Sequence, residues 1–264
     1  MRLIRTISLF LLLCAGLVAG AAELNCHGPA NVEEFRYTWR LRGGLGWIAG
    51  LVFPRTGVGN LKTTYPQDGG GATIDSSLLI TAPEGTSGGF YAYESQMDEK
   101  GKTLMTYHGY AWGKKARKER TVFDYVKRLA RIRKETPEKV EDKVKPLPPQ
   151  ELRDVLTAIY FLRQHAAEIR GPLQTSIYSD GKEYPVIFRP AGTQSFTIEG
   201  QKVQAVGFEI VDAPGGKKWP GGVKLWLTND ARRIPLRIEI SQSLASMQLD
   251  LQSVEACAFL QASR

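Results

Sequence analysis

The feature that most constrains this chain is an alternation of apolar and polar residues that recurs in many short segments. In the first of them, Phe35, Tyr37, Trp39 and Leu41 are separated by polar or basic neighbours. Because successive side chains of a strand point to opposite faces of a sheet, this pattern predicts strands that bury one face. It also predicts strands at 103–112, 120–126, 184–190, 203–211, 223–228, 234–240 and 246–254.

Residues that favour turns separate these segments. Asp180-Gly181 and Asn229-Asp230 stand between apolar runs at positions typical of hairpin tips. Many short strands in series favour an antiparallel barrel or a strongly curved sheet, because closure removes exposed edges. The expected fold class is therefore mainly β: an antiparallel curved sheet or open β-barrel wrapped against one amphipathic helix.

The helix is predicted in the segment that follows two prolines. PPQEL (148–152) is interpreted as its start, and Arg170-Gly171-Pro172 as its end, with Gly171 in the left-handed conformation. An apolar face at helical spacing should cover the concave side of the sheet. Its members are Leu152, Val155, Leu156, Ile159, Leu162, Ala166 and Ile169.

Asp154 and Arg163 mark the polar ends of this helix. At 100° per residue they point to opposite sides, so they are not expected to pair with each other. Tyr160 and Arg163 are three residues apart and share a side. Two interpretations stay open for that pair: contact with the anionic group of a ligand, or a hydrogen bond to a strand end.

The N-terminus has the layout of a signal peptide. Arg2 and Arg5 precede an apolar run, and small residues follow it, so cleavage is expected near Ala21 or Ala22. The run is shorter than the roughly 20 residues that a membrane span needs. We therefore expect residues 1–22 to be removed and residues 23–264 to form a single β-rich domain in the periplasm.

Cleavage would leave Cys26 and Cys257, which lie near opposite ends of the mature chain. In an oxidising compartment two such cysteines favour a structural disulfide. With only His27 nearby, they do not supply four zinc ligands. Neither a metal site nor a cofactor is expected.

The chain carries a formal net charge of +8, and much of the excess lies in 113–120 and 127–145. Export argues against nucleic acid as the partner, whereas anionic head groups or acidic glycans fit the compartment. The alternative is a solvated hairpin tip and linker. We interpret 113–149 as a basic, Pro-rich insert in which 137–150 is an exposed linker. Glycine-rich 43–60 is interpreted as a flexible hairpin or mouth loop.

Four segments in order resemble the bacterial exported family called domain of unknown function 3108. They are FRYTWRL, DVLTAIYFLR, GKEYPVIF and LWLTNDARRIPLRIEI. The helix motif of the family falls on Asp154, Thr157, Ala158, Ile159, Tyr160 and Arg163, and its last motif on Trp226, Asp230, Arg233 and Pro235. The resemblance implies a mostly antiparallel envelope protein without an established activity, similar in outline to half-barrel carriers such as lipoprotein chaperones. It implies structural roles for Asp154, Gly171, Asp230 and Pro235. The segments 113–149 and 43–60 depart from its compact pattern.

Catalytic signatures are sparse in this sequence. It has three histidines, no His-x-x-x-His pair and no Gly-x-Ser-x-Gly motif. His108, between Tyr107 and Tyr110, is typical of a strand face. The first hypothesis is a non-catalytic carrier with an apolar cavity for a lipid or other amphipathic envelope ligand. The candidate lining residues are Trp39, Tyr107, Trp112, Tyr160, Arg163 and Trp226; the alternative is that the aromatic residues among them simply fill the interior. The second is an envelope scaffold, in peripheral contact with the membrane or an acidic partner, that binds through the basic segment. An enzyme is the third and least favoured.

Overall fold

The computed structural model describes residues 24, 28–42, 55–67, 73–82, 89–112, 114–169, 171–179, 181–219, 221–241 and 246–256. Within these residues it has one helix, α2 (Val155–His165), and fourteen strands. The strands are β1 (Val32–Arg42), β2 (Thr56–Thr64), β3 (Ile74–Thr81), β4 (Phe90–Met97), β5 (Thr103–Trp112), β6 (Lys115–Asp124), β7 (Leu129–Glu135), β8 (Val140–Pro146), β9 (Leu173–Ser179), β10 (Lys182–Ile198), β11 (Gln201–Asp212), β12 (Gly222–Thr228), β13 (Pro235–Ser241) and β14 (Ser246–Ala256).

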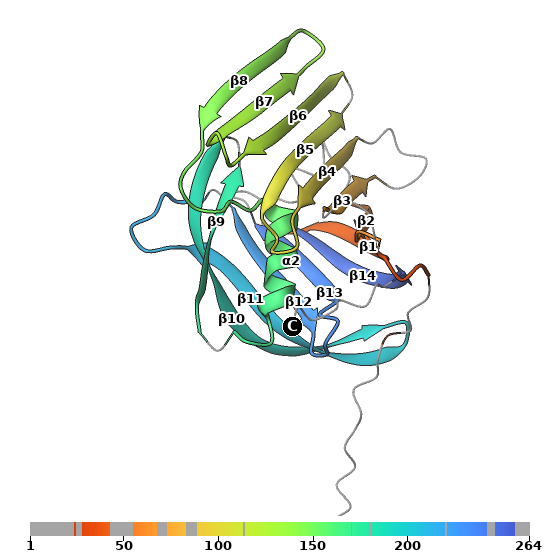
Figure 1. Cartoon of the computed structure of the whole chain (residues 1–264). Coiled ribbons are helices and arrows are strands. Elements are labelled where there is room, and N and C mark those ends of the chain that lie inside the picture. The colour runs from red at the N-terminus through yellow and green to blue at the C-terminus, as the bar shows by residue number, and fades with distance from the viewer. Residues whose placement is uncertain are drawn as a thin grey trace, which may run out of the picture.

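All fourteen strands form one antiparallel sheet in the order β8-β7-β6-β5-β4-β3-β2-β1-β14-β13-β12-β11-β10-β9. Every strand pairs with a neighbour in sequence, except where β1 pairs with β14 and brings the ends of the domain together. The series of paired strands is interrupted between β8 and β9, where α2 is inserted. The sheet curves around α2 and does not close, which leaves β8 and β9 as its edges (Figure 1). The predicted fold class is confirmed, as are the strands predicted from alternation.

Several segments fold differently from their predictions. Residues 140–146, expected in a linker, form edge strand β8. The glycine-rich segment 43–60, interpreted as a flexible hairpin or mouth loop, ends in β2, which begins at Thr56 and pairs with β1 as an antiparallel hairpin. Residues 43–54 lie outside the described part of the chain. β8 forms because its backbone pairs with β7 along its whole length, which offsets its poor hydrophobic pattern. The predicted insert is thus largely a continuation of the sheet.

The helix begins later and ends earlier than predicted. Asp154 is its N-cap, and Asp154 and Thr157 form a reciprocal capping box that fixes the start at Val155. Residues before it are extended instead: Arg153 pairs with the free edge of β9 through Ser176 and Tyr178. A turn after His165, closed by the Glu168 amide on the His165 carbonyl, ends the helix. Gly171 has no positive φ and is not its left-handed cap, so that prediction is wrong.

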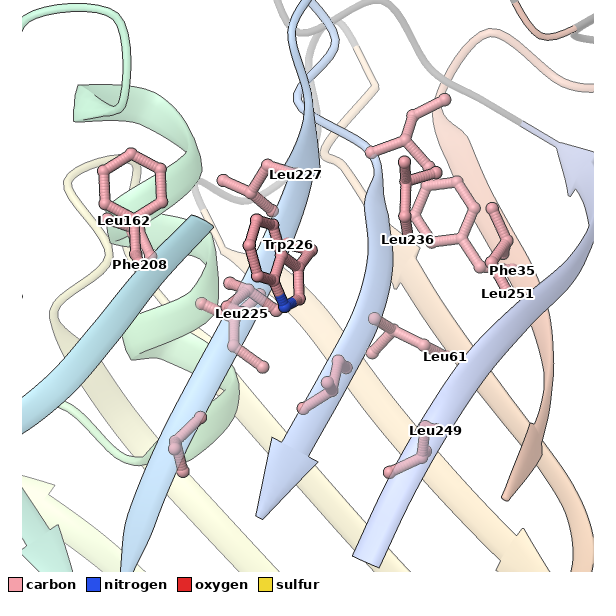
Figure 2. Packing of buried hydrophobic residues seen from close by; sticks show 14 of the residues in the cluster. Phe35, Leu61, Leu162, Phe208, Leu225, Trp226, Leu227, Leu236, Leu249 and Leu251 are labelled. Atoms are coloured by element: carbon pink, nitrogen blue, oxygen red, sulfur yellow. The ribbon is translucent and has the colours of Figure 1, made fainter. Parts of the chain in front are cut away.

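One large core fills the space between α2 and the sheet. We call the face of the sheet that packs against α2 the inner face. Leu156, Ile159 and Leu162 of the helix pack there against apolar side chains from both halves of the sheet. Figure 2 shows Leu162 with Leu225 of β12 and Leu61 of β2, members of the same cluster. The interior is therefore filled by side chains.

The two ends of the sheet overlap. Ile177 of β9 lies in the main core, so its neighbour Tyr178 points to the outer face. Tyr178 nevertheless packs against Phe123 of β6, at 5.1 Å between ring centroids, and Ala130 of β7. The inner face of β6 and β7 thus covers the outer face of β9, and the sheet is a spiral instead of a closed barrel.

A second overlap occurs at the tip of the long β10–β11 hairpin. An irregularity between Pro190 and Gly192 shifts the register and reverses which side chains face inward. Beyond it, Phe196 packs against Trp226 of β12, with 5.9 Å between ring centroids, and under Arg237 of β13. Trp226 and Arg237 point away from α2, so the hairpin tip covers the outer face of the sheet.

Candidate functional site

A row of buried polar side chains crosses the inner face from β1 to β6. Each member lies directly opposite the next on the neighbouring strand, and all are less than a tenth exposed. We call this set the polar row; it consists of Glu33, Thr63, Ser76, Ser95, Thr106 and Thr121. Buried polar groups need partners. The helix supplies two of them, at Glu33 and at Ser95.

Arg163 of α2 forms a two-pronged ion pair with Glu33. Nη1 and Nη2 of Arg163 donate to Oε2 and Oε1 of Glu33 at 2.7 and 2.8 Å, and both side chains are almost completely buried. Its Nε and Nη2 also donate to the carbonyls of Arg233 and Arg232, in the β12–β13 turn. Burial alone would lower the pKa of Arg163. The charge of Glu33 and its hydrogen bonds outweigh this effect, so the pKa of Arg163 is raised and the guanidinium keeps its charge.

The predicted contact between Arg163 and a ligand does not fit this geometry, because its donors are already engaged. Tyr160 is also buried, among Ile74, Met97 and Tyr65. Its hydroxyl accepts a hydrogen bond from Gln164 Nε2 at 2.9 Å, and burial raises the pKa of Tyr160 to about 12. Of the two interpretations, contact with a ligand or a hydrogen bond within the fold, the structure shows the second for Arg163, which binds β1 and the β12–β13 turn.

Asp154 holds the other end of the helix. Its carboxylate accepts hydrogen bonds from Ser95 Oγ and, at 2.8 Å, from the Thr157 amide, while its own amide donates to Thr103 Oγ1 at 3.1 Å. Burial raises the pKa of Asp154; hydrogen bonds from Ser95 and Thr157 and the charge of His108 oppose this. Asp154 and Arg163 thus do not meet, and each binds the polar row at a separate place.

Asp230 and Pro235 shape the turn that receives Arg163. Asp230 accepts hydrogen bonds from Thr228 Oγ1 at 2.6 Å and from the side chain and amide of Arg232. The carbonyl of Pro235 accepts from Tyr37 Oη at 2.8 Å. The positive φ of Arg233, 49°, aims the carbonyls of the turn at the helix. These contacts are internal to the fold.

The aromatic residues predicted to line an interior cavity are dispersed. Tyr107 alternates with the inner-face residue His108 and therefore points outward. Trp226 also points outward and lies over Gly207, where a Cβ would approach its ring to 2.7 Å. Trp39 is buried and donates from Nε1 to the Thr81 carbonyl at 2.8 Å. The side chain of Trp112 and both Cys26 and Cys257 lie outside the described part of the chain.

A groove of about 710 Å³ opens on the outer face, between the β10–β11 hairpin tip and the strands it crosses. Trp39 is one of its lining residues, and Trp226 supports the ring of Phe196 that forms part of its wall. The other lining residues include Thr38 and Arg40 of β1, Thr56 and Val58 of β2, Gln194, Phe196 and Ile198 of β10, Arg237 of β13, and Asp250 and Gln252 of β14. We call this the hairpin groove.

Two arginines and one carboxylate set the electrostatics of the hairpin groove. Asp250 accepts from Arg40 Nη2 at 3.0 Å and from Arg237 Nε at 2.5 Å, and Gln248 Nε2 donates to both of its oxygens. The guanidinium carbon of Arg237 lies 4.9 Å from the centroid of the Phe196 ring. The groove therefore combines an apolar wall with a net positive charge.

Sequence reasoning missed Phe196, Arg237 and Asp250 as site residues. Arg237 and Asp250 occupy ordinary outward positions of two predicted strands, and they meet because β13 and β14 pair in that register. Phe196 reaches them through the hairpin bulge. The bulge had one sequence signal, Pro190 followed by Gly192 within a strand pattern.

Within the described residues, no group of three or more His, Cys, Asp and Glu side chains is arranged to hold a metal ion. In the same part of the chain, no helix is long and apolar enough to cross a membrane.

The fold and the outer groove define an open, barrel-like β protein built around one helix. The chain belongs to the family described as protein of unknown function (DUF3108), whose model matches residues 62–252. The resemblance inferred from sequence is thereby confirmed. A search of curated proteins gave no match.

Among solved structures, the chain is similar to a beta-barrel-like protein of domain of unknown function DUF1849 from Brucella abortus. The TM-score is 0.55 at 10% identity, and the match covers 86% of this chain and 98% of that one. At this identity the likeness concerns the fold alone.

The buried ion pair generates a prediction about stability. Arg163→Met should lower the free energy of unfolding by about 3–5 kcal/mol, because it leaves the Glu33 carboxylate buried without a counter-charge. Glu33→Gln with Arg163→Met should recover part of this loss. Urea unfolding of the single and double variants measures both effects.

The matched control is the exposed pair Arg189–Glu209, in which Arg189→Met should cost at most about 1 kcal/mol. Equal losses at the two arginines would contradict a special role for the buried pair.

A second prediction concerns pH. The pKa of Asp154 is raised above its ordinary value of 3.8, so the native state binds this proton more tightly than the unfolded chain. The contribution of Asp154 to stability should therefore be largest below pH 3.8 and fall as pH rises through the folded pKa. Asp154→Asn keeps a good N-cap and removes the titration. Urea unfolding between pH 4 and 8 should show the wild-type protein losing stability relative to this variant as pH rises; a constant difference would refute the assignment.

Proposed function

We propose that this protein is an exported, non-catalytic binding protein that holds an amphipathic, anionic envelope ligand in the hairpin groove. The observation that carries the proposal is the meeting of Phe196 with Arg237 in a groove large enough for a small ligand. Small-molecule sites typically combine apolar walls with a few convergent polar groups.

The two kinds of lining residue suit the two parts of such a ligand. Val58, Phe196 and Ile198 offer apolar contact, and Val58 is 43% exposed in the absence of a ligand. Arg40 and Arg237 use one guanidinium nitrogen each on Asp250 and keep further N–H groups for a carboxylate or phosphate.

The same lining supports binding over catalysis. Asp250 is the single acidic residue among those that line the groove, and two arginines and Gln248 already engage it. General acid–base chemistry needs a group that is free to exchange a proton with the substrate. Among the described residues that line the groove there is no histidine or cysteine.

The ligand binds on the outer face of the sheet and not in its interior. An interior carrier cavity was expected from the sequence, but Leu156, Ile159 and Leu162 of the helix fill that space. A ligand of appreciable size would have to displace α2, which is held at both ends by buried polar contacts. The hairpin groove needs no such displacement.

Export to the periplasm and a disulfide between Cys26 and Cys257 belong to the same proposal. The basic and apolar start of the chain supports export. Gly28 packs so closely on Ala256 that a Cβ at position 28 would lie 2.8 Å from the Ala256 Cβ. These two residues stand two and one positions from the cysteines, which supports their pairing.

Dodecanoate is a suitable amphipathic anion to test the groove. Its binding is followed by quenching of tryptophan fluorescence, because Trp39 lines the site. Val58→Asp should weaken binding at least about tenfold, since it places a like charge and removes apolar contact at once.

Leu79→Asp is the matched control, because Leu79 is 44% exposed, lies on the next strand and does not line the groove. It should change the dissociation constant less than twofold. The hairpin groove is excluded as the site if both variants bind equally, or if neither dodecanoate nor any component of an envelope lipid extract is retained in native mass spectrometry.

The disulfide is tested on protein purified from the periplasm. Non-reducing peptide mass spectrometry should give a linked pair containing Cys26 and Cys257. Cys26→Ser with Cys257→Ser should lower the free energy of unfolding by about 5 kcal/mol in the chain-entropy model, because the bond closes almost the whole chain. Two free thiols in the purified protein would disprove the bond.

A further inference from the structure

The positive charge of this protein is concentrated in one part of the sheet. Residues 113–149 contain thirteen Lys and Arg against six Asp and Glu, a net charge of +7. The whole chain has a net charge of +8. Since β6, β7 and β8 occupy this segment, the excess charge lies at one end of the sheet (Figure 1).

The register of these strands arranges exposed side chains in rows on their outer face. In one row, Arg120 of β6, Arg133 of β7 and Asp142 of β8 lie opposite one another. In the next, Arg131 of β7 lies between Val122 and Val144. We call this surface the basic face.

Arg120 and Arg133 break a rule of sheet stability. They are directly opposite each other, and like charges in that position destabilise a sheet. Arg133 has Glu135 and Asp142 nearby, but neither Arg120 nor Arg131 has an ion-pair partner among the described residues. Arg133 is thus compensated within the sheet, whereas Arg120 and Arg131 are not, and uncompensated side chains of this kind are expected at functional surfaces.

Exposed valines accompany the arginines. Val140 and Val144 of β8 are 55% and 61% exposed, and Val126 in the β6–β7 turn is 95% exposed. The free energy falls when such exposed apolar surface is transferred out of water. The basic face thus offers both charge and apolar side chains to a partner.

We propose that the basic face docks the protein onto a membrane surface rich in anionic phospholipid. The cations lie at the level of the head groups, and the valines, with Val126 foremost, enter the interface. Each Lys or Arg near such a surface is attracted to its negative potential. An acidic glycan would use the arginines but leave the valines in water, and a peptide added to the edge of β8 would not explain the arginines on its face.

The experiment is co-sedimentation of the full chain with vesicles of phosphatidylglycerol and phosphatidylcholine, against vesicles of phosphatidylcholine alone. Binding to the anionic vesicles is expected, and it should weaken as salt is raised. Arg120→Gln with Arg131→Gln should lower the partition coefficient about 30-fold, at about fivefold per cation. Neither arginine has an ion pair in the fold, so this variant should stay folded.

The control removes the same charge elsewhere. Arg36→Gln with Arg189→Gln alters two exposed arginines outside the basic face and should lower partition less than threefold. Val126→Ser should lower it about fivefold while leaving the salt dependence unchanged. Equal losses in the two arginine variants, equal binding to both kinds of vesicle, or retention on heparin without binding to vesicles would each overturn the proposal. The result is independent of the hairpin groove, which lies on other strands.

Discussion

The ion pair between Glu33 and Arg163 is the constraint on which the arrangement of this fold depends. It joins the first strand, the helix and the β12–β13 turn, which are far apart in sequence, at one completely buried point. Apolar packing is not directional, so it specifies the position of a helix on a curved sheet less sharply than a polar contact does. A buried ion pair specifies that position, because any shift that separates the pair leaves each ion desolvated and alone. Asp154 fixes the opposite end of the helix at Ser95. Two polar contacts, one near each end, therefore fix the position of α2 along its axis.

Filling the interior with a fixed helix moves the available surfaces outward. A closed barrel has no edges and a ligand in its lumen, whereas here the sheet winds past closure and covers parts of its own outer face. Overlap at β9 and at the β10–β11 tip buries parts of the outer face without hydrogen-bonded closure, and the extended residue Arg153 pairs with the edge of β9. The second overlap also creates the hairpin groove, because a twisted hairpin lying across other strands cannot match their curvature everywhere. The proposed ligand site is thus a by-product of the way the spiral ends.

The sequence predicts those parts of the fold that obey a local rule. Strands with an apolar inner face, such as β1 and β12, were found from alternation. β3 and β4 were missed because their inner faces carry Ser76 and Ser95 of the polar row, which hide the pattern. The start of the helix was misplaced because Leu152 fits the helical spacing, although it packs in the separate cluster under β6 and β9. The groove residues escaped because Arg237 and Asp250 meet through strand register, and register is set by the whole sheet.

Two groups of arginines on the outer face illustrate two different physical uses of the same residue. Arg40 and Arg237 share Asp250, so their positions are fixed, and a ligand would meet a preorganised pair with a defined geometry. Arg120 and Arg131 share no carboxylate, so they keep their rotational freedom and suit a surface on which charges are mobile and unspecified. Preorganisation favours selective binding of one small molecule, whereas flexible cations favour a diffuse anionic layer. The neutralising acid, which Arg40 and Arg237 share and Arg120 and Arg131 lack, is therefore the feature that separates the proposed ligand site from the proposed docking surface.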